Sequence, residues 1–167
     1  MGGRLLRAAA RVACALLLAA SATVWGDDAA IDALIDKSRV ALSEGKPKAA
    51  VAALTEAIEK APDRSELYSL RARAYDANND FKAAIADATK AVELAPNDPY
   101  PYIERAKIYV AMEKMDLALA DANKAIEVAP NEPDGYYVRS DIYRDMGKSA
   151  EADRDEKKAE EIDQANR

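Results

Sequence analysis

The chain repeats itself with a period of 34 residues, and this repetition constrains its fold more than any other feature. When residues 65–98 are aligned with residues 99–132, identical residues fall in register along the whole stretch. The matched pairs are Tyr68/Tyr102, Arg71/Arg105, Ala72/Ala106, Tyr75/Tyr109, Ala84/Ala118, Asp87/Asp121, Ala88/Ala122, Lys90/Lys124 and Ala91/Ala125. A period of this length predicts a stack of similar units, each of which buries its apolar face only against its neighbours.

The repeat extends in both directions and divides the chain into units 31–64, 65–98, 99–132 and 133–166. Within each unit, apolar residues recur at helical spacing on both sides of a short turn, which predicts two antiparallel helices. Asp63 and Glu66 are spaced as a capping box for the first helix of unit two. The predicted fold class is all-α, an α-solenoid of eight helices within a domain spanning residues 31–166.

Numbered from 1, each unit resembles the tetratricopeptide repeat. That family has an aromatic residue at position 4, a small residue at 8, Tyr at 11, Ala at 20 and 27, and Pro at 32. Units two and three match at all of these positions, whereas Arg71 and Arg105 stand at position 7, where Leu is usual. The resemblance implies an α-solenoid that binds proteins or peptides, a frame used for many different partners.

The last helix differs from its counterparts on the face that would meet a following unit. Unit three carries Leu119, Ala122 and Ile126 on this face, whereas unit four carries Asp153, Glu156 and Glu160. A polar outer face is what a terminal repeat requires, so this helix is predicted to cap the array.

Residues 1–22 have the pattern of a secretory signal peptide. Three arginines precede an apolar run at 12–20, and Ala20-Ser21-Ala22 offers a cleavage site after Ala22. Residues 23–30 would then form a short linker. The expected location is the periplasm or the outside of the cell. A mitochondrial presequence is the alternative, because it is also rich in Arg and poor in acidic residues.

Composition limits the chemistry that the chain can perform. The sequence has no His and a single Cys, Cys14, which predicts no metal site, no cofactor and no catalytic dyad based on either residue. The net charge of −6 becomes −9 when the three leader arginines are removed, which argues against nucleic acid as a partner. We therefore expect a protein that is not an enzyme.

Charged residues recur together at two positions of the repeat. Position 7 carries Arg71, Arg105 and Arg139, and position 23 carries Asp87, Asp121 and Asp155. Unit one has neither charge, with Lys37 and Ala53 at these places. Charges that are present or absent together predict structural ion pairs across a helix interface, which fix the register of packing.

The resemblance also implies where a ligand would lie, since in this family ligands usually occupy the concave groove of the first helices at positions 2, 5, 9 and 12. The groove residues carried over in this way are Arg39, Arg73, Lys107, Tyr100, Ile103, Val110, Tyr137 and Arg144. A column of cations beside an apolar patch predicts a groove for an extended segment with carboxylates and one or two apolar anchors. The alternative is a solvated face whose cations balance nearby acids. Ile35, Arg39, Leu70, Tyr100 and Glu104 do not supply the carboxylate clamp of the family's chaperone receptors.

These observations predict a non-catalytic interaction scaffold that binds a peptide or protein segment in the concave groove. A second hypothesis is a structural or assembly subunit of a larger envelope complex, which would use the convex face or the ends of the array.

Overall fold

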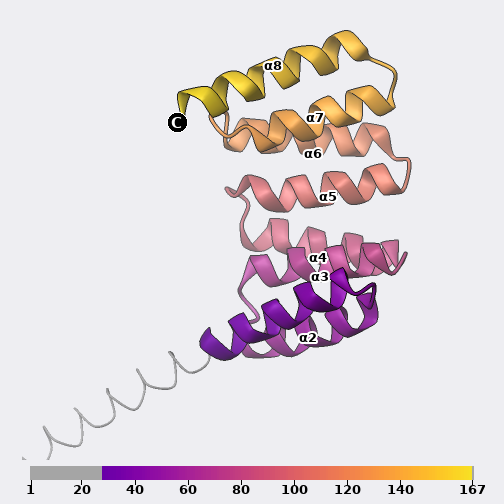
Figure 1. Ribbon diagram of the computed structural model, residues 1–167, viewed down its shortest axis with the longest axis vertical. Helices are drawn as coiled ribbons and strands as arrows, with labels where there is room; N and C mark the ends of the chain where they lie inside the picture. Colours follow the sequence, from indigo (N-terminus) through magenta and orange to yellow (C-terminus); the bar gives the residue numbers. More distant parts are fainter. Residues whose placement is uncertain (1–27, 167) are drawn as a thin grey trace, which may run out of the picture.

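The computed structural model describes residues 28–166, which form helices joined by short turns (Figure 1). Residues 28–43 form the described part of the first helix. It is followed by α2 (Pro47–Lys60), α3 (Ser65–Ala77), α4 (Phe81–Leu94), α5 (Pro99–Ala111), α6 (Met115–Val128), α7 (Asp134–Asp145) and α8 (Ser149–Ala165). Residues 28–30 are therefore helical, although the sequence placed them in a linker. The predicted signal peptide and its cleavage site lie outside the described residues.

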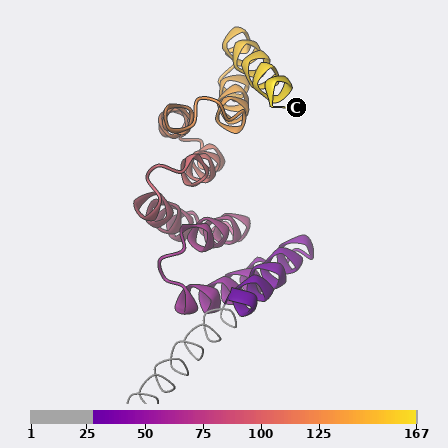
Figure 2. The same cartoon turned by 90° about the vertical axis from the view of Figure 1, so that its left-hand side faces the viewer.

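The helices form four antiparallel pairs that stack in chain order, one pair for each 34-residue unit. The first helices of successive pairs also contact one another, α3 with α5 and α5 with α7. Figure 2 shows that the stack is curved and that the first helix and α8 project to the same side. The first helices line the inner, concave side of this curve, and the second helices lie on the outer side.

The turn inside each unit places the same position of the repeat in the left-handed backbone region. This residue, number 15 of the unit, is Gly45, Asn79, Glu113 or Gly147, with φ of 68°, 58°, 58° and 72°. Glycine adopts this conformation without steric cost, and asparagine tolerates it better than most residues. Glu113 has neither advantage, so the third turn is strained relative to the other three.

Helix α5 begins with a capping aspartate and a proline, whereas the capping box expected at the start of α3 does not form. Asp98 accepts a hydrogen bond from the Tyr100 N–H and caps α5, whose first residue is proline. The capping box predicted at Asp63 and Glu66 was wrong. The N-cap residue of α3 is Arg64, so Asp63 lies one residue too early to reach the free N–H groups of the helix.

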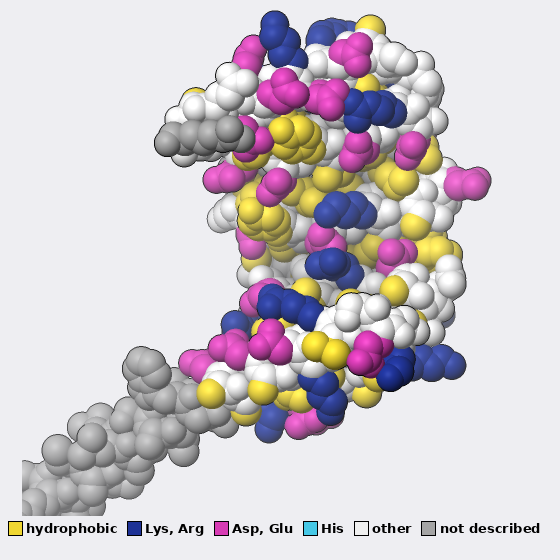
Figure 3. Space-filling view, viewed as in Figure 1, with side chains coloured by type: hydrophobic (Ala, Val, Ile, Leu, Met, Phe, Trp, Pro, Cys, Tyr) yellow, Lys and Arg dark blue, Asp and Glu magenta, His cyan; other side chains and the backbone are white. Residues whose placement is uncertain are grey.

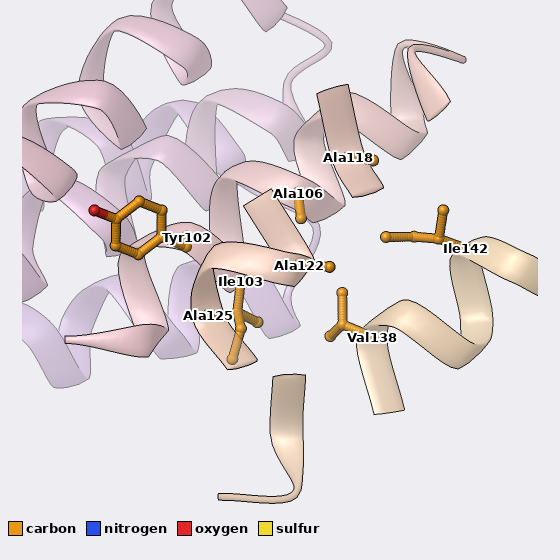
Figure 4. Packing of buried hydrophobic residues seen from close by; sticks show 8 residues of the cluster. All are labelled: Tyr102, Ile103, Ala106, Ala118, Ala122, Ala125, Val138 and Ile142. Carbon is orange, nitrogen blue, oxygen red and sulfur yellow. The ribbon is translucent and has the colours of Figure 1, made fainter. Parts of the chain in front are cut away.

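Alanines at positions 8, 20 and 27 allow the helices of a pair to approach closely. Figure 4 shows the cluster around α5, α6 and α7, in which Ala106, Ala118 and Ala125 are at most 1% exposed. Val138 and Ile142 of α7 pack onto this cluster from the next unit. Because Ala106 is fully buried between the helices, a larger side chain there would force them apart, at a cost of about 1–3 kcal/mol.

The outer face of α8 is polar, in contrast to the equivalent face of α6. Ala122 of α6 is fully buried, whereas at the same position of α8 Glu156 is half-buried and paired with Arg144. Asp153 and Glu160 are exposed to solvent.

Candidate functional site

Each arginine at position 7 forms a bidentate ion pair with the aspartate at position 23 of its own unit. In Arg105 the Nε and Nη2 groups donate to the two oxygens of Asp121 at 2.7 and 2.8 Å. Arg71 binds Asp87 in the same way at 2.6 and 2.9 Å, and Arg139 binds Asp155 at 2.7 and 2.7 Å. The structure thus brings together all three pairs named from the sequence, and planar pairing of this kind is among the strongest polar contacts in proteins.

The third nitrogen of each arginine bonds to the preceding unit, which the sequence reading missed. Nη1 of Arg71 donates to Oγ1 of Thr55 at 3.1 Å, and Nη1 of Arg105 donates to Oγ1 of Thr89 at 3.3 Å. Arg139 makes the equivalent bond to Oδ1 of Asn123 at 2.6 Å. Each guanidinium therefore joins the two helices of its own unit to the second helix of the preceding unit.

The surroundings of these arginines explain how a charge is held inside the stack. The Arg71 guanidinium lies over the rings of Tyr68 and Tyr75, 5.8 and 5.9 Å from their centres, so the rings cover it without competing for its hydrogen bonds. The hydrogen bond to Asp87 raises the pKa of Arg71. Asp87 is only 8% exposed, so it depends on the arginine to offset its lost hydration.

Three hollows lie between the first helices and share lining residues, so they form one continuous groove. The first, about 430 Å³, lies between α3 and α5 and is lined by Leu70, Tyr100 and Pro101 among others. The second, about 350 Å³, shares Arg73 and Glu104 with it. The third, about 190 Å³, lies between α5 and α7 and shares Lys107 with the second.

The cations predicted for this groove are already paired with carboxylates. Arg73 and Lys107 both contact Glu104, at 3.4 and 3.0 Å, and the Glu104 side chain is only 16% exposed. Arg39 contacts Asp36 at 3.2 Å at a solvent-exposed position. The sequence left two interpretations open, a groove for a carboxylate-bearing segment and a solvated face whose cations balance nearby acids, and these contacts are of the second kind. The two acids stand at position 6 of their units.

The apolar residues predicted for the groove divide into accessible and buried ones. Tyr100 is 53% exposed at the edge of the first hollow, and half-buried Val110 lines the third. Ile103 is only 3% exposed and belongs to the core cluster around α5 and α6, so it cannot act as a surface anchor. Tyr100 and Ile103 are only three residues apart, about one helical turn, so the position in the repeat alone did not distinguish the exposed residue from the buried one.

The two predicted residues on α7 face toward α8. The Tyr137 hydroxyl donates to Oδ2 of Asp163 at 2.8 Å, and this bond raises the pKa of Tyr137. Arg144 contacts Asp141 at 3.2 Å and also pairs with Glu156. Both side chains therefore hold the last pair of helices together at the edge of the groove.

Two tetratricopeptide repeat models match the chain, one over residues 35–99 and the other over residues 100–132 and 133–166. Together they span most of the sequence, and the chain belongs to the tetratricopeptide repeat family, with about four repeats. Such a domain is generally a protein–protein interaction module and is typically non-catalytic. The search of curated proteins returned no significant match.

Solved structures share this fold. The crystal structure of MamA aligns with a TM-score of 0.65 at 22% identity, covering 81% of this chain and 80% of that one. A tetratricopeptide repeat protein of Thermus thermophilus, TTC0263, gives a TM-score of 0.71 at 18% identity, with 79% and 74% covered. The first such domain of Spaghetti (RPAP3), bound to the HSP90 peptide SRMEEVD, gives 0.61 at 24% identity, with 70% and 95% covered. At these identities the likeness concerns the fold alone.

Residues 28–166 offer neither a membrane-spanning helix nor a cluster of metal-binding side chains. None of the helices there is long and apolar enough to cross a membrane. In the same residues, no three side chains among His, Cys, Asp and Glu are grouped as the ligands of a metal ion would be.

Proposed function

We propose that the protein is a scaffold that binds an extended segment of a partner protein in its concave groove. The observation that carries this proposal is the continuous line of three hollows between the first helices. Each hollow has room for one or two side chains, and an extended chain presents side chains at regular intervals. The peptide-bound structure of Spaghetti supports the proposal by analogy of fold.

Tyr100 is the best candidate for an anchor in this groove. It is large, is 53% exposed, and stands at the edge of the largest of the three hollows. Exposed tyrosines contribute strongly to binding because they bury much apolar area with little loss of side-chain freedom. The negative charge of Asp134 raises the pKa of the Tyr100 hydroxyl.

Exposed apolar residues elsewhere favour the second hypothesis, an assembly subunit that uses the ends or the outer face. Val40 is 55% exposed, whereas its counterparts Ala74, Ile108 and Ile142 are at most 1% exposed against a preceding unit. Leu117 on α6 is 47% exposed and borders a hollow at the α5–α6 turn. A partner seated on these residues would leave the groove empty.

Two matched variants separate the hypotheses. Tyr100→Ala removes an exposed side chain of the groove, and Leu117→Ala removes a similarly exposed side chain of a second helix. Partners captured from an envelope extract would be titrated against both variants by calorimetry. The groove proposal expects a loss of about tenfold or more with Tyr100→Ala, the size typical of a binding anchor, and unchanged affinity with Leu117→Ala. The reverse pattern would favour the assembly subunit.

The proposed setting of this binding is outside the cytoplasm. The support is the pattern of residues 1–22, which has a basic start, an apolar run and small residues before the expected cleavage point. N-terminal sequencing of the protein from its native host should then begin at Thr23. Recovery of an intact Met1 in the cytosolic fraction would contradict export.

A further inference from the structure

The groove is acidic, although its cations first suggested the opposite. The charged residues that line the three hollows are six carboxylates and two cations: Glu66, Asp76, Asp98, Glu104, Asp141, Asp145, Arg73 and Lys107. Both cations contact the same carboxylate, Glu104. Figure 3 shows Lys and Arg side chains along this face with acidic side chains on either side of them.

Two of the remaining carboxylates are available to a ligand. Within residues 28–166, Asp76 and Asp145 have no Lys or Arg nitrogen within ion-pair distance. Glu66 contacts Arg64 at 3.4 Å, the same distance at which Arg73 contacts Glu104, so it is already paired. Because opposite charges offered by a ligand would lie beside low-dielectric walls, they would be attracted more strongly here than at an open surface.

Apolar surface accompanies the carboxylates. The accessible apolar residues are Leu70 and Tyr100 in the first hollow, beside Glu66, and Val110 in the third, beside Asp145. Each of these two hollows therefore offers an apolar wall next to a carboxylate. A lysine or arginine side chain matches this arrangement, because its methylene stem packs on apolar surface while its charged end reaches the acid.

We propose that the segment bound in the concave groove is basic, with lysine or arginine residues interleaved with aliphatic or aromatic ones. This inference rests on the proposed function and names the chemistry of its partner. It replaces the carboxylate-bearing ligand expected from the sequence, because Glu104 already engages both cations that would have received those carboxylates.

The state of Asp76 is consistent with such a ligand. Burial and the nearby charge of Glu104 raise the pKa of Asp76, so its ionised form is disfavoured in the free protein. A cation placed beside these two carboxylates would remove that disadvantage. A residue that destabilises the free protein but interacts favourably with a bound ligand is typical of a functional site.

The experiment starts from random ten-residue peptides displayed on phage and selected on the full chain. Enriched peptides should carry at least two Lys or Arg residues together with an aliphatic or aromatic residue. Synthetic versions would then be titrated by fluorescence anisotropy. Their affinity should fall as salt is raised, because charges separated by more than about 8–10 Å are screened at physiological ionic strength.

Two double variants with equal charge changes locate the binding site. Asp76→Asn with Asp145→Asn removes two charges from the groove. Glu93→Gln with Glu127→Gln removes two from the second helices, where both glutamates are largely exposed. The groove variant should raise the Kd by about five- to tenfold, the size expected for two exposed ion pairs, and the control should leave it unchanged.

The possible failures are distinguishable. Enriched peptides that are acidic or neutral, and that lose affinity with Tyr100→Ala, would retain the groove as the binding site and overturn its proposed preference for cations. Equal weakening by both double variants would show diffuse attraction and would also overturn that preference. Binding that Tyr100→Ala leaves unchanged and Leu117→Ala abolishes, or no enrichment at all, would contradict both this inference and the proposed function.

Discussion

Replacing Arg105 by leucine should destabilise the protein, although leucine is the usual residue of the family at this position. The change removes two hydrogen bonds to Asp121 and one to Thr89, and it leaves the Asp121 carboxylate 7% exposed without its partner. Stranding a fully buried charge costs about 3–5 kcal/mol. Some water reaches this pair, because the Arg105 side chain is 17% exposed, so we expect a loss of about 2 kcal/mol.

The assay is a double-mutant cycle measured by denaturant unfolding and by heat. A loss of about 2 kcal/mol corresponds to a fall in Tm of about 4–8 °C for a chain of this size. Arg105→Leu combined with Asp121→Asn should recover much of the loss, since the stranded carboxylate is then neutral. Lys90→Leu serves as the control, because the Lys90 side chain pairs only at 3.9 Å at an exposed position.

The cycle can refute this reasoning. If the effects of Arg105→Leu and Asp121→Asn add to within about 0.3–0.5 kcal/mol, the two side chains are independent. The contacts seen between them would then contribute nothing specific to stability, and their recurrence in three units would need another explanation.

Three smaller predictions follow from strained or unsatisfied groups, each checked by chemical unfolding of the variant. Glu113→Gly should stabilise the protein by about 0.5–1 kcal/mol, because φ is 58° at this residue, whereas Gly45→Ala should destabilise it. Ser140→Ala should gain about 1 kcal/mol, because the buried Ser140 hydroxyl lacks a partner among the described residues. Ser38→Ala, at the same repeat position, removes a bond to the Ile35 carbonyl and should give no such gain. Asp76→Asn should stabilise at neutral pH. The folded-state pKa of Asp76 is raised, so its penalty is present above that pKa, and the gain should vanish below the ordinary value of 3.8. An equal gain at pH 3 and pH 7 would contradict this assignment.

The period of the sequence predicted the helices and the three ion pairs because both depend on residues that recur without change. The Arg at position 7 and the Asp at position 23 occur together in three units, and both are absent from unit one. Their pairing could therefore be predicted from this co-occurrence alone. The third bond of each arginine was missed because its acceptor varies between threonine and asparagine. A repeat position whose residue varies between units is usually interpreted as a surface position. Here, however, the threonine and the asparagine each supply an oxygen that accepts the hydrogen bond of the arginine.

The groove was predicted less well, because its character depends on neighbours that do not follow the repeat. Glu104 engages Arg73 of the preceding unit and Lys107 of its own unit, and position 6 of that preceding unit is Leu70. The cations at position 9 therefore did not by themselves predict the electrostatic character of the groove. Ile103 was expected to be an anchor because it shares the expected groove face with Tyr100 and Val110, yet packing against the neighbouring helices covers it.

The three-way bonds of the arginines have a consequence for how an array of this kind can change in length. Arg105 reaches 16 residues forward to Asp121 and 16 residues back to Thr89. A duplicated copy of residues 99–132 placed in tandem would meet Asn123 on one side and offer its own Asn to Arg139 on the other, so every bond would form again. An insertion within the helices whose length is not a whole number of units would leave an arginine facing the wrong residues. The array can therefore be lengthened by whole repeat units. Each added unit would extend the concave surface by one first helix and leave the packing at both ends unchanged.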